Sequence, residues 1–104
     1  MRRIEPKDLK RSDQILDVRS DEERRKVSLV WPHFAVPLDD LDPDEFMQEH
    51  DLDTTRPLYI ICRTENRAAI AAVEFEEAGY PNTVVVKGGI QRAIEQGIPV
   101  KYEE

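Results

Sequence analysis

Short apolar runs alternate with amphipathic segments along most of this chain. Four runs rich in branched side chains are expected to form strands, at residues 14–18, 34–38, 57–62 and 83–87. The runs at 57–62 and 83–87 are too short for helices and apolar on both faces, as the buried strands of parallel sheets are. Pro37 favours a strand end or a sheet edge for the 34–38 run, because proline cannot donate a ladder hydrogen bond.

Helix signals fill the gaps between these runs. Helices are expected over residues 21–27, 67–78 and 90–96, and another is expected to begin at Pro43. Ser20 and Glu23 form a capping box in front of the first, and Asp42 precedes Pro43 as the N-cap of the other. Gly79 supplies a stop after the longest helix. The alternation of strands and helices predicts an α/β fold with a mostly parallel sheet.

Length and composition fit one domain with a modest core, which we assign to residues 1–104, because 39% of the chain is hydrophobic. No stretch approaches the ~18 apolar residues of a membrane span, and no apolar run follows the basic residues at the start, so we expect neither an anchor nor a secretory signal. One cysteine permits no internal disulfide, which fits a reducing compartment and a cytoplasmic protein. The net charge of −7 argues against nucleic-acid and anionic-membrane partners.

The only cysteine, Cys62, stands where the predicted 57–62 strand ends, just before the predicted 67–78 helix. Ligand sites of open α/β sheets collect at the carboxyl ends of strands. A helix N-terminus offers unpaired N–H groups and about half a positive charge, and Arg63 and Arg67 add further positive charge. These features favour the nucleophilic thiolate and would hold an anionic substrate. The alternative is that Cys62 is a small buried hydrophobe, although the charged turn after it favours a functional role.

Four segments in order resemble a single-domain rhodanese. They are "LDVRSDEE" at 16–23, the six-residue loop from Cys62 to Arg67, "AGYPNTVVVKGG" at 78–89, and "GIPV" at 97–100. The resemblance covers about residues 4–100, and it implies a three-layer α/β fold with a mostly parallel five-stranded sheet flanked by helices. It also implies a sulfurtransferase, whose loop cysteine accepts sulfane sulfur as a persulfide and passes it to a nucleophile such as cyanide or a cellular thiol.

The resemblance assigns a role to every residue of the loop. Cys62 would be the catalytic residue. The substrate-binding residues would be Arg63, Thr64, Glu65, Asn66 and Arg67. Successive N–H groups that point into the loop would hold the charge of the terminal sulfur. The implied partners are a small anionic sulfur donor such as thiosulfate and a thiol or protein acceptor, and the chemistry requires no metal or organic cofactor.

The sequence departs from the family pattern at three places. Glu65 stands where the loop usually has a glycine, residues 28–33 lack the family's histidine-containing segment, and Ala93 replaces a tryptophan. If the glycine position needs a positive φ, Glu65 costs about 1 kcal/mol of backbone strain. Its charge would also lie beside an anion site. We therefore expect Glu65 to weaken the use of thiosulfate, and Glu65→Gly to relax the loop and speed turnover.

Two other functions are compatible with the sequence. A low-activity binding or regulatory module would keep the fold with little turnover, and Glu65 and the altered 28–33 segment favour it. A phosphatase-like or arsenate-reducing enzyme uses a related loop, but one with an additional residue. Only four residues separate Cys62 from Arg67, and a tetrahedral phosphate needs the wider ring. For Asp17, a capping or ion-pairing role is favoured over support of the active site.

Overall fold

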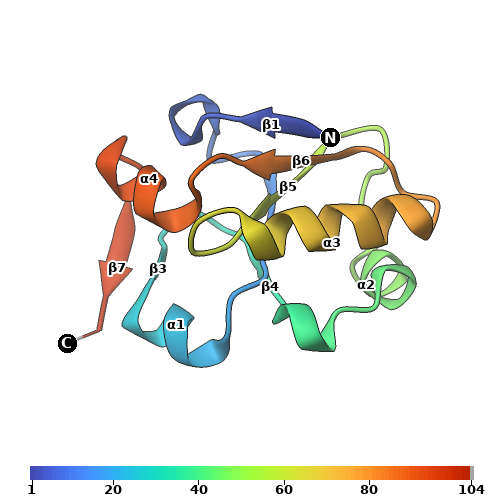
Figure 1. Cartoon of the computed structure of the whole chain (residues 1–104), viewed down its shortest axis with the longest axis horizontal. Coiled ribbons are helices and arrows are strands. Elements are labelled where there is room, and N and C mark those ends of the chain that lie inside the picture. Colours follow the sequence, from blue (N-terminus) through green and yellow to red (C-terminus); the bar gives the residue numbers. More distant parts are fainter. Residues whose placement is uncertain (104) are drawn as a thin grey trace.

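The computed structural model describes residues 1–103 and confirms an α/β fold with a parallel five-stranded sheet flanked by helices (Figure 1). The strand order is β1-β6-β5-β2-β4, and each neighbouring pair is parallel. The strands are β1 (Arg2–Ile4), β2 (Gln14–Asp17), β4 (Phe34–Ala35), β5 (Leu58–Ile61) and β6 (Thr83–Val86). Because all five run in one direction, their carboxyl ends lie together along one side of the sheet. We call this side the carboxyl-end edge, to distinguish it from the outer strands β1 and β4.

The sequence patterns predicted four of these five strands. The three apolar runs at the centre of the sheet are confirmed as β2, β5 and β6. The run that contains Pro37 becomes β4, a two-residue strand at the sheet edge, as the proline indicates. Strand β1 was not predicted. It is short and polar, and it forms the other edge by pairing with β6, with Arg3 opposite Val85.

The predicted helices are confirmed with small shifts at their ends. The α-helices are α1 (Asp21–Lys26), α2 (Pro43–His50), α3 (Asn66–Glu77) and α4 (Gly89–Glu95), and the 3₁₀ turns are η1 (Pro6–Asp8) and η2 (Leu38–Asp40). Both bonds of the capping box between Ser20 and Glu23 are present, and the Asp42 carboxylate accepts from the Glu45 N–H. Gly79 follows α3 with φ +94°. Every helix within residues 1–103 is too short or too polar to cross a lipid bilayer.

Consecutive strand residues point to opposite faces of the sheet and so enter two separate cores. On one face, Ile60 packs with Phe46 of α2 and with a row of α3 side chains that includes Phe75. On the other face, Ile61 packs with Ile90 of α4. The buried alanines of α3 lie in the first core and let the helix approach the sheet closely. They are Ala68, Ala71 and Ala72.

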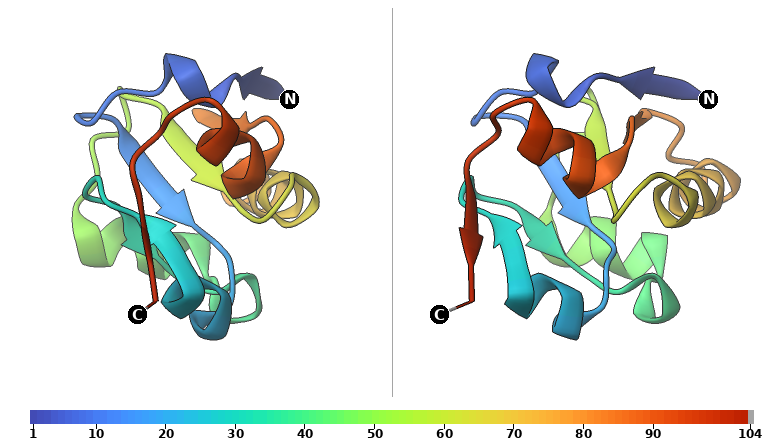
Figure 2. Two further views of the ribbon diagram at one scale, coloured as in Figure 1. Left: turned by 90° about the vertical axis from the view of Figure 1, so that its left-hand side faces the viewer. Right: turned by 60° about the vertical axis from the view of Figure 1, so that its left-hand side comes forward.

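A second, two-stranded sheet was not predicted. It pairs β3 (Val27–Leu29) with β7 (Val100–Tyr102) in antiparallel register, and the two strands lie side by side in Figure 2. Leu29 and Val100 of this ribbon pack into the core on the α4 side. The ribbon therefore fixes the segment that follows α1, and with it the position of α1 near the carboxyl ends of the parallel strands.

Candidate active site

Cys62 follows β5 directly, at the edge of the sheet where the parallel strands end. Asp17, the last residue of β2, lies opposite Ile61 in the register, and the Val18 N–H donates to the Ile61 carbonyl at 3.0 Å. Strand β6 ends beside them and turns into α4 through Gly88. The predicted position of Cys62, at the carboxyl end of a strand in a parallel sheet, is therefore confirmed.

The thiol of Cys62 lies at the start of α3 and is only 1% exposed. Its Sγ accepts a hydrogen bond from the Ala68 N–H, at 3.4 Å. Glu65, the N-cap of α3, provides no side-chain cap, so the sulfur takes one of the N–H groups that a helix start leaves unpaired. This contact places an N–H donor and the positive end of the helix beside the sulfur.

The backbone N–H groups of the loop have no partner in the part of the chain that the structure describes. Within residues 1–103, none of the backbone N–H groups from Arg63 to Arg67 donates a hydrogen bond. Successive free N–H groups beside a nucleophilic sulfur form the type of nest that binds an anion. The side chains of Arg63, Thr64 and Asn66 are exposed. Their predicted contacts with substrate stay a prediction.

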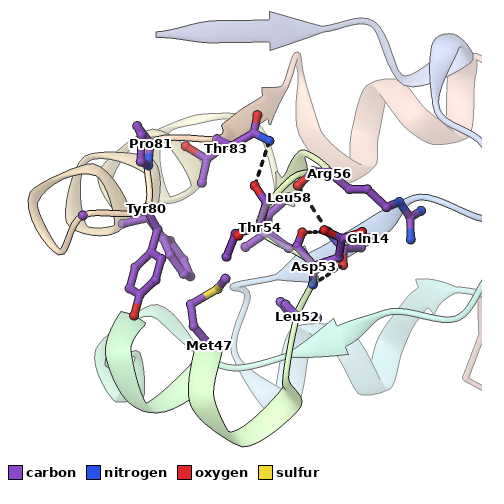
Figure 3. A pocket seen from close by; sticks show the side chains of 13 residues that line it. Gln14, Met47, Leu52, Asp53, Thr54, Arg56, Leu58, Tyr80, Pro81 and Thr83 are labelled. Atoms are coloured by element: carbon purple, nitrogen blue, oxygen red, sulfur yellow. Dashed lines mark hydrogen bonds between the residues drawn. The ribbon is translucent and has the colours of Figure 1, made fainter.

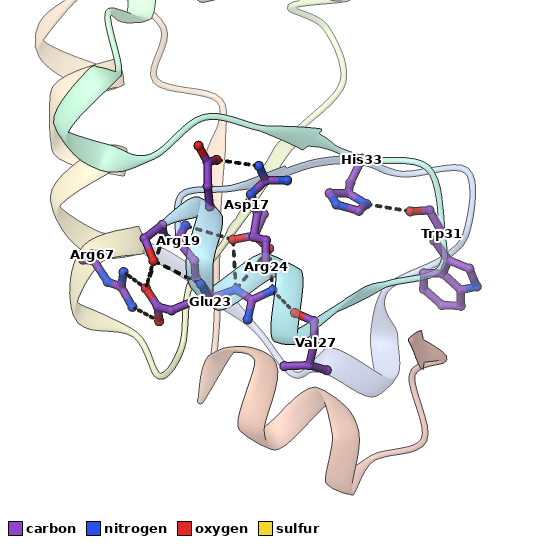
Figure 4. Close-up of polar contacts among 10 residues, drawn as sticks. Asp17, Arg19, Glu23, Arg24, Val27, Trp31, His33 and Arg67 are labelled. Carbon is purple, nitrogen blue, oxygen red and sulfur yellow. Dashed lines mark hydrogen bonds and ion pairs between the residues drawn. The ribbon is translucent and has the colours of Figure 1, made fainter. Parts of the chain in front are cut away.

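Arg67, the last residue of the loop, is held in an ion pair. Its guanidinium donates to both carboxylate oxygens of Glu23 in α1, at 2.6 and 2.8 Å (Figure 4). The hydrogen bond from Arg67, aided by those from Ser20 and opposed by burial, lowers the pKa of Glu23 to about 2. The same bond raises the pKa of Arg67, with smaller contributions from the Cys62 and Asp17 charges. Helix α1 is thus tied to the loop.

Asp17 and Arg19 form a buried ion pair under this edge. Their side chains are 0% and 2% exposed, and the Arg19 guanidinium contacts both Asp17 oxygens at 2.9 to 3.1 Å. Arg19 also donates to the Val27 carbonyl at 2.8 Å, which connects the pair to β3 (Figure 4). The ion-pairing role predicted for Asp17 is confirmed.

Glu65 corrects one expectation from the sequence. Its φ is −161°, so the backbone there does not need glycine and the predicted strain is wrong. Its carboxylate accepts from Arg3 Nε of β1 at 3.0 Å and from the Gly88 N–H at 3.1 Å. The hydrogen bond from Arg3, followed by that from Gly88, lowers the pKa of Glu65. The charge that was expected beside the anion site is therefore paired with a cation.

The turn from β6 into α4 holds the loop from behind. The Ile90 N–H donates to the Cys62 carbonyl at 2.8 Å, and the Gln91 N–H donates to the Arg63 carbonyl at 3.3 Å. Gly89 has φ +60°, and a Cβ atom there would lie 2.4 Å from the Cys62 carbonyl oxygen. Only a glycine fits such a close approach, so Gly89 lets the backbones of loop and turn meet.

A family model of the rhodanese-like domain matches residues 3–95, which is most of the chain. The chain belongs to the rhodanese-like domain family. A rhodanese-related protein from Thermoplasma volcanium is 33% identical, with 100% of both chains covered and a TM-score of 0.73. A rhodanese-like domain protein from Staphylococcus aureus is 25% identical, covering 97% of this chain and 99% of its own, with a TM-score of 0.70. No curated protein matches the chain significantly.

A third solved structure shows the fold at lower identity. A protein from Bacillus halodurans is 18% identical, covering 98% of this chain and 77% of its own, with a TM-score of 0.79. The fold assigned from the sequence is thus shared with distant proteins.

This rhodanese-like domain also has a pocket at the opposite edge of the sheet, where the strands begin. The pocket has a volume of about 260 Å³ and lies beside Gln14, Leu58 and Thr83, at the starts of β2, β5 and β6 (Figure 3). Phe75 and Tyr80 contribute apolar walls. Across residues 1–103, no three side chains of His, Cys, Asp or Glu gather as metal ligands would.

Two residues that contact the Cys62 loop were not predicted as its partners. Glu23 was identified only as a capping residue, yet the same carboxylate binds Arg67. The sequence did contain a clue to this contact, because the capping box places the Glu23 carboxylate at the N-terminal end of α1. Arg3 gave no signal, because its contact with Glu65 depends on a strand pairing between distant parts of the chain.

Proposed function

We propose that this rhodanese-like domain is a sulfurtransferase in which Cys62 carries sulfane sulfur as a persulfide. The observation that supports it most is the position of the thiol. Cys62 Sγ accepts the Ala68 N–H at the start of α3, and within residues 1–103 the N–H groups of residues 63–67 donate to no other group. A terminal persulfide sulfur on Cys62 would find those donors unoccupied.

The reaction is balanced with thiosulfate as donor. The Cys62 thiolate attacks the sulfane sulfur, a new S–S bond forms, and the S–S bond of the donor breaks with its electron pair leaving on sulfite. An acceptor such as cyanide or a thiolate then attacks the terminal sulfur, and Cys62 leaves as the thiolate. The free N–H groups would hold the negative charge on the outer sulfur in both steps. The acceptor is a small nucleophile or a thiol on another protein.

A low-activity binding or regulatory module is the second candidate. The specific observation in its favour is the burial of Cys62, which is only 1% exposed, together with the commitment of Arg67 to Glu23. A sulfur donor such as thiosulfate must reach the buried sulfur through the loop. Arg67 must also separate from Glu23 before all its N–H groups can bind that molecule. Either requirement would slow turnover without changing the fold.

Intact-mass measurement tests the proposal. After incubation with thiosulfate or an organic persulfide, the protein should gain one sulfur atom, and cyanide or dithiothreitol should remove it. Cys62→Ser should abolish the gain. A wild-type protein that gains no sulfur from any donor, while its cysteine still reacts with a small alkylating reagent, would favour the low-activity module.

A further inference from the structure

The middle of the Cys62 loop is fastened by a side chain rather than by the backbone. At its start, the carbonyls of Cys62 and Arg63 accept N–H groups of α4. The backbone N–H groups that follow are unused within residues 1–103. Beyond Arg63, the ion pair of Arg67 with Glu23 holds the end of the loop. The Glu65 carboxylate holds its middle, because it accepts from the Gly88 N–H at 3.1 Å and from Arg3 Nε at 3.0 Å.

These two contacts join three elements. Gly88 is the N-cap of α4 and has φ +67°, and a Cβ on the next residue, Gly89, would collide with the Cys62 carbonyl. Arg3 belongs to the edge strand β1. Arg92 of α4 adds positive charge near the Glu65 carboxylate. One carboxylate therefore links the loop, the β6–α4 turn and the outer strand β1.

The two contacts differ in strength. The ion pair between Arg3 and Glu65 is exposed, with side chains 42% and 34% accessible, and such pairs contribute little. The bond from Gly88 is charge-assisted and half-buried, and its loss would leave the N–H without an acceptor. The contact with Gly88 should therefore dominate.

We propose that Glu65 is a positioning residue, which holds the Cys62 loop in its sulfur-binding shape before any donor arrives. This inference rests on the proposed sulfurtransferase function and concerns the same loop. It reverses the expectation from the sequence, in which Glu65 was a handicap. A preorganised ring of donors lowers the reorganisation needed when charge develops on the sulfur, so the chemical step rather than donor binding should depend on Glu65.

Three variants separate the contacts. Glu65→Ala removes both contacts, Glu65→Gln keeps an oxygen for the Gly88 N–H, and Arg3→Ala removes the ion pair alone. Arg2→Ala is the matched control, because Arg2 is the neighbouring arginine of β1 but binds Asn82 instead. For each variant, hydrogen exchange of the Gly88 N–H, the alkylation rate of Cys62 by iodoacetamide and the rate of sulfur uptake from thiosulfate are measured.

Glu65→Ala should speed exchange of the Gly88 N–H by about tenfold, as expected for the loss of a charge-assisted bond. It should lower the maximal rate of sulfur uptake by a similar factor and leave the half-saturating thiosulfate concentration within about twofold. Glu65→Gln should keep both the Gly88 exchange rate and the maximal rate of sulfur uptake close to their wild-type values. Arg3→Ala should change them by about twofold or less, and Arg2→Ala should leave them unchanged.

Sulfur uptake by Glu65→Ala at or above the wild-type rate would overturn the inference, and so would unchanged exchange at Gly88. Failure of the proposed function gives a different pattern. In that case no variant takes up sulfur, while Gly88 exchange and Cys62 alkylation still respond to Glu65→Ala and support its positioning role in the loop.

Discussion

The two edges of the central sheet differ in what they offer to a ligand. The edge where the strands begin has the pocket of about 260 Å³ beside Leu58 and Phe75, with apolar walls and no thiol among its lining residues. The edge where the strands end has the Cys62 sulfur, unused N–H groups and paired charges. The direction of the strands, rather than concavity, concentrates reactive groups, because helix starts and their free N–H groups follow strand ends.

The largest effect on stability should come from the buried ion pair at the end of β2. Asp17→Asn leaves the Arg19 guanidinium buried without a counter-charge, which should lower the free energy of unfolding by about 3–5 kcal/mol. Urea denaturation measures this loss. Asp53→Asn is the control at the opposite edge, where the carboxylate is exposed and its removal should change stability little. Equal losses in the two variants would contradict the contrast between the edges.

Two glycines allow the same substitution to be compared at both edges. Gly89→Ala adds a Cβ against backbone atoms of the loop, so we expect it to cost about 2–4 kcal/mol and to reduce sulfur uptake severalfold. Gly79→Ala, beside the pocket, also forces a positive φ but meets no atom within 4 Å, so about 1 kcal/mol is expected. Thermal unfolding and intact-mass kinetics would show whether only Gly89→Ala disturbs the sulfur chemistry.

The ion pair between Glu23 and Arg67 should give the carboxyl-end edge a characteristic pH dependence. Since the pKa of Glu23 is lowered to about 2 from 4.5, its contribution to stability is fully present above pH 4.5 and is lost as the pH falls toward 2. Glu23→Gln should therefore lower the free energy of unfolding at pH 7 by about 1–2 kcal/mol.

Unfolding measured at several pH values checks this prediction, because the gap between Glu23→Gln and the wild type should close below about pH 2. Glu22→Gln is the control on the same helix. Its exposed pair with Lys26 should contribute almost nothing at any pH. A gap for Glu23→Gln that persists at the lowest pH would mean that the carboxylate stabilises α1 through something other than its charge.

The smallest effect is expected at the pocket. Met47→Ala removes a half-buried side chain from its wall and should cost about 1 kcal/mol. The rate of sulfur uptake should stay within about twofold of the wild type, because Met47 lines the pocket where the strands begin, at the end of the sheet opposite the Cys62 loop. A large loss of uptake at preserved stability would show that the two edges communicate through α3 or β5.

The sequence predicted the central fold because its signals are local. Apolar runs of five or six residues located β2, β5 and β6, and the caps at Ser20, Asp42 and Gly79 indicated helix ends. Strand β1 and the β3–β7 ribbon were missed, because three-residue strands carry no periodic pattern. Their pairings, such as that of Val27 with Tyr102, join residues far apart in the chain.

At the candidate site, the position of Cys62 was predicted, and the contacts of the loop were not. Cys62 lies at the strand end as expected, and the family resemblance supplied the loop. The expectation of strain at Glu65 was wrong, because a positive φ was inferred from the glycine usual at this position, whereas the φ of Glu65 is −161°. The partners of Arg67 and Glu65 lie on α1 and β1, and pairing between distant charges leaves no mark in a local pattern.

The pairing of β1 with β6 has a consequence for how the protein is made. Arg2 lies beside Val84, so the first strand of the chain must wait until most of the chain has left the ribosome before it can join the sheet. At about 5–20 residues per second, this delay lasts several seconds. During that time β6 has not been made, so β1 has no strand to pair with. The ion pair between Arg3 and Glu65 cannot form until β1 joins the sheet. The nascent chain must keep its early polar residues soluble and unpaired, which a segment rich in arginine and lysine does well.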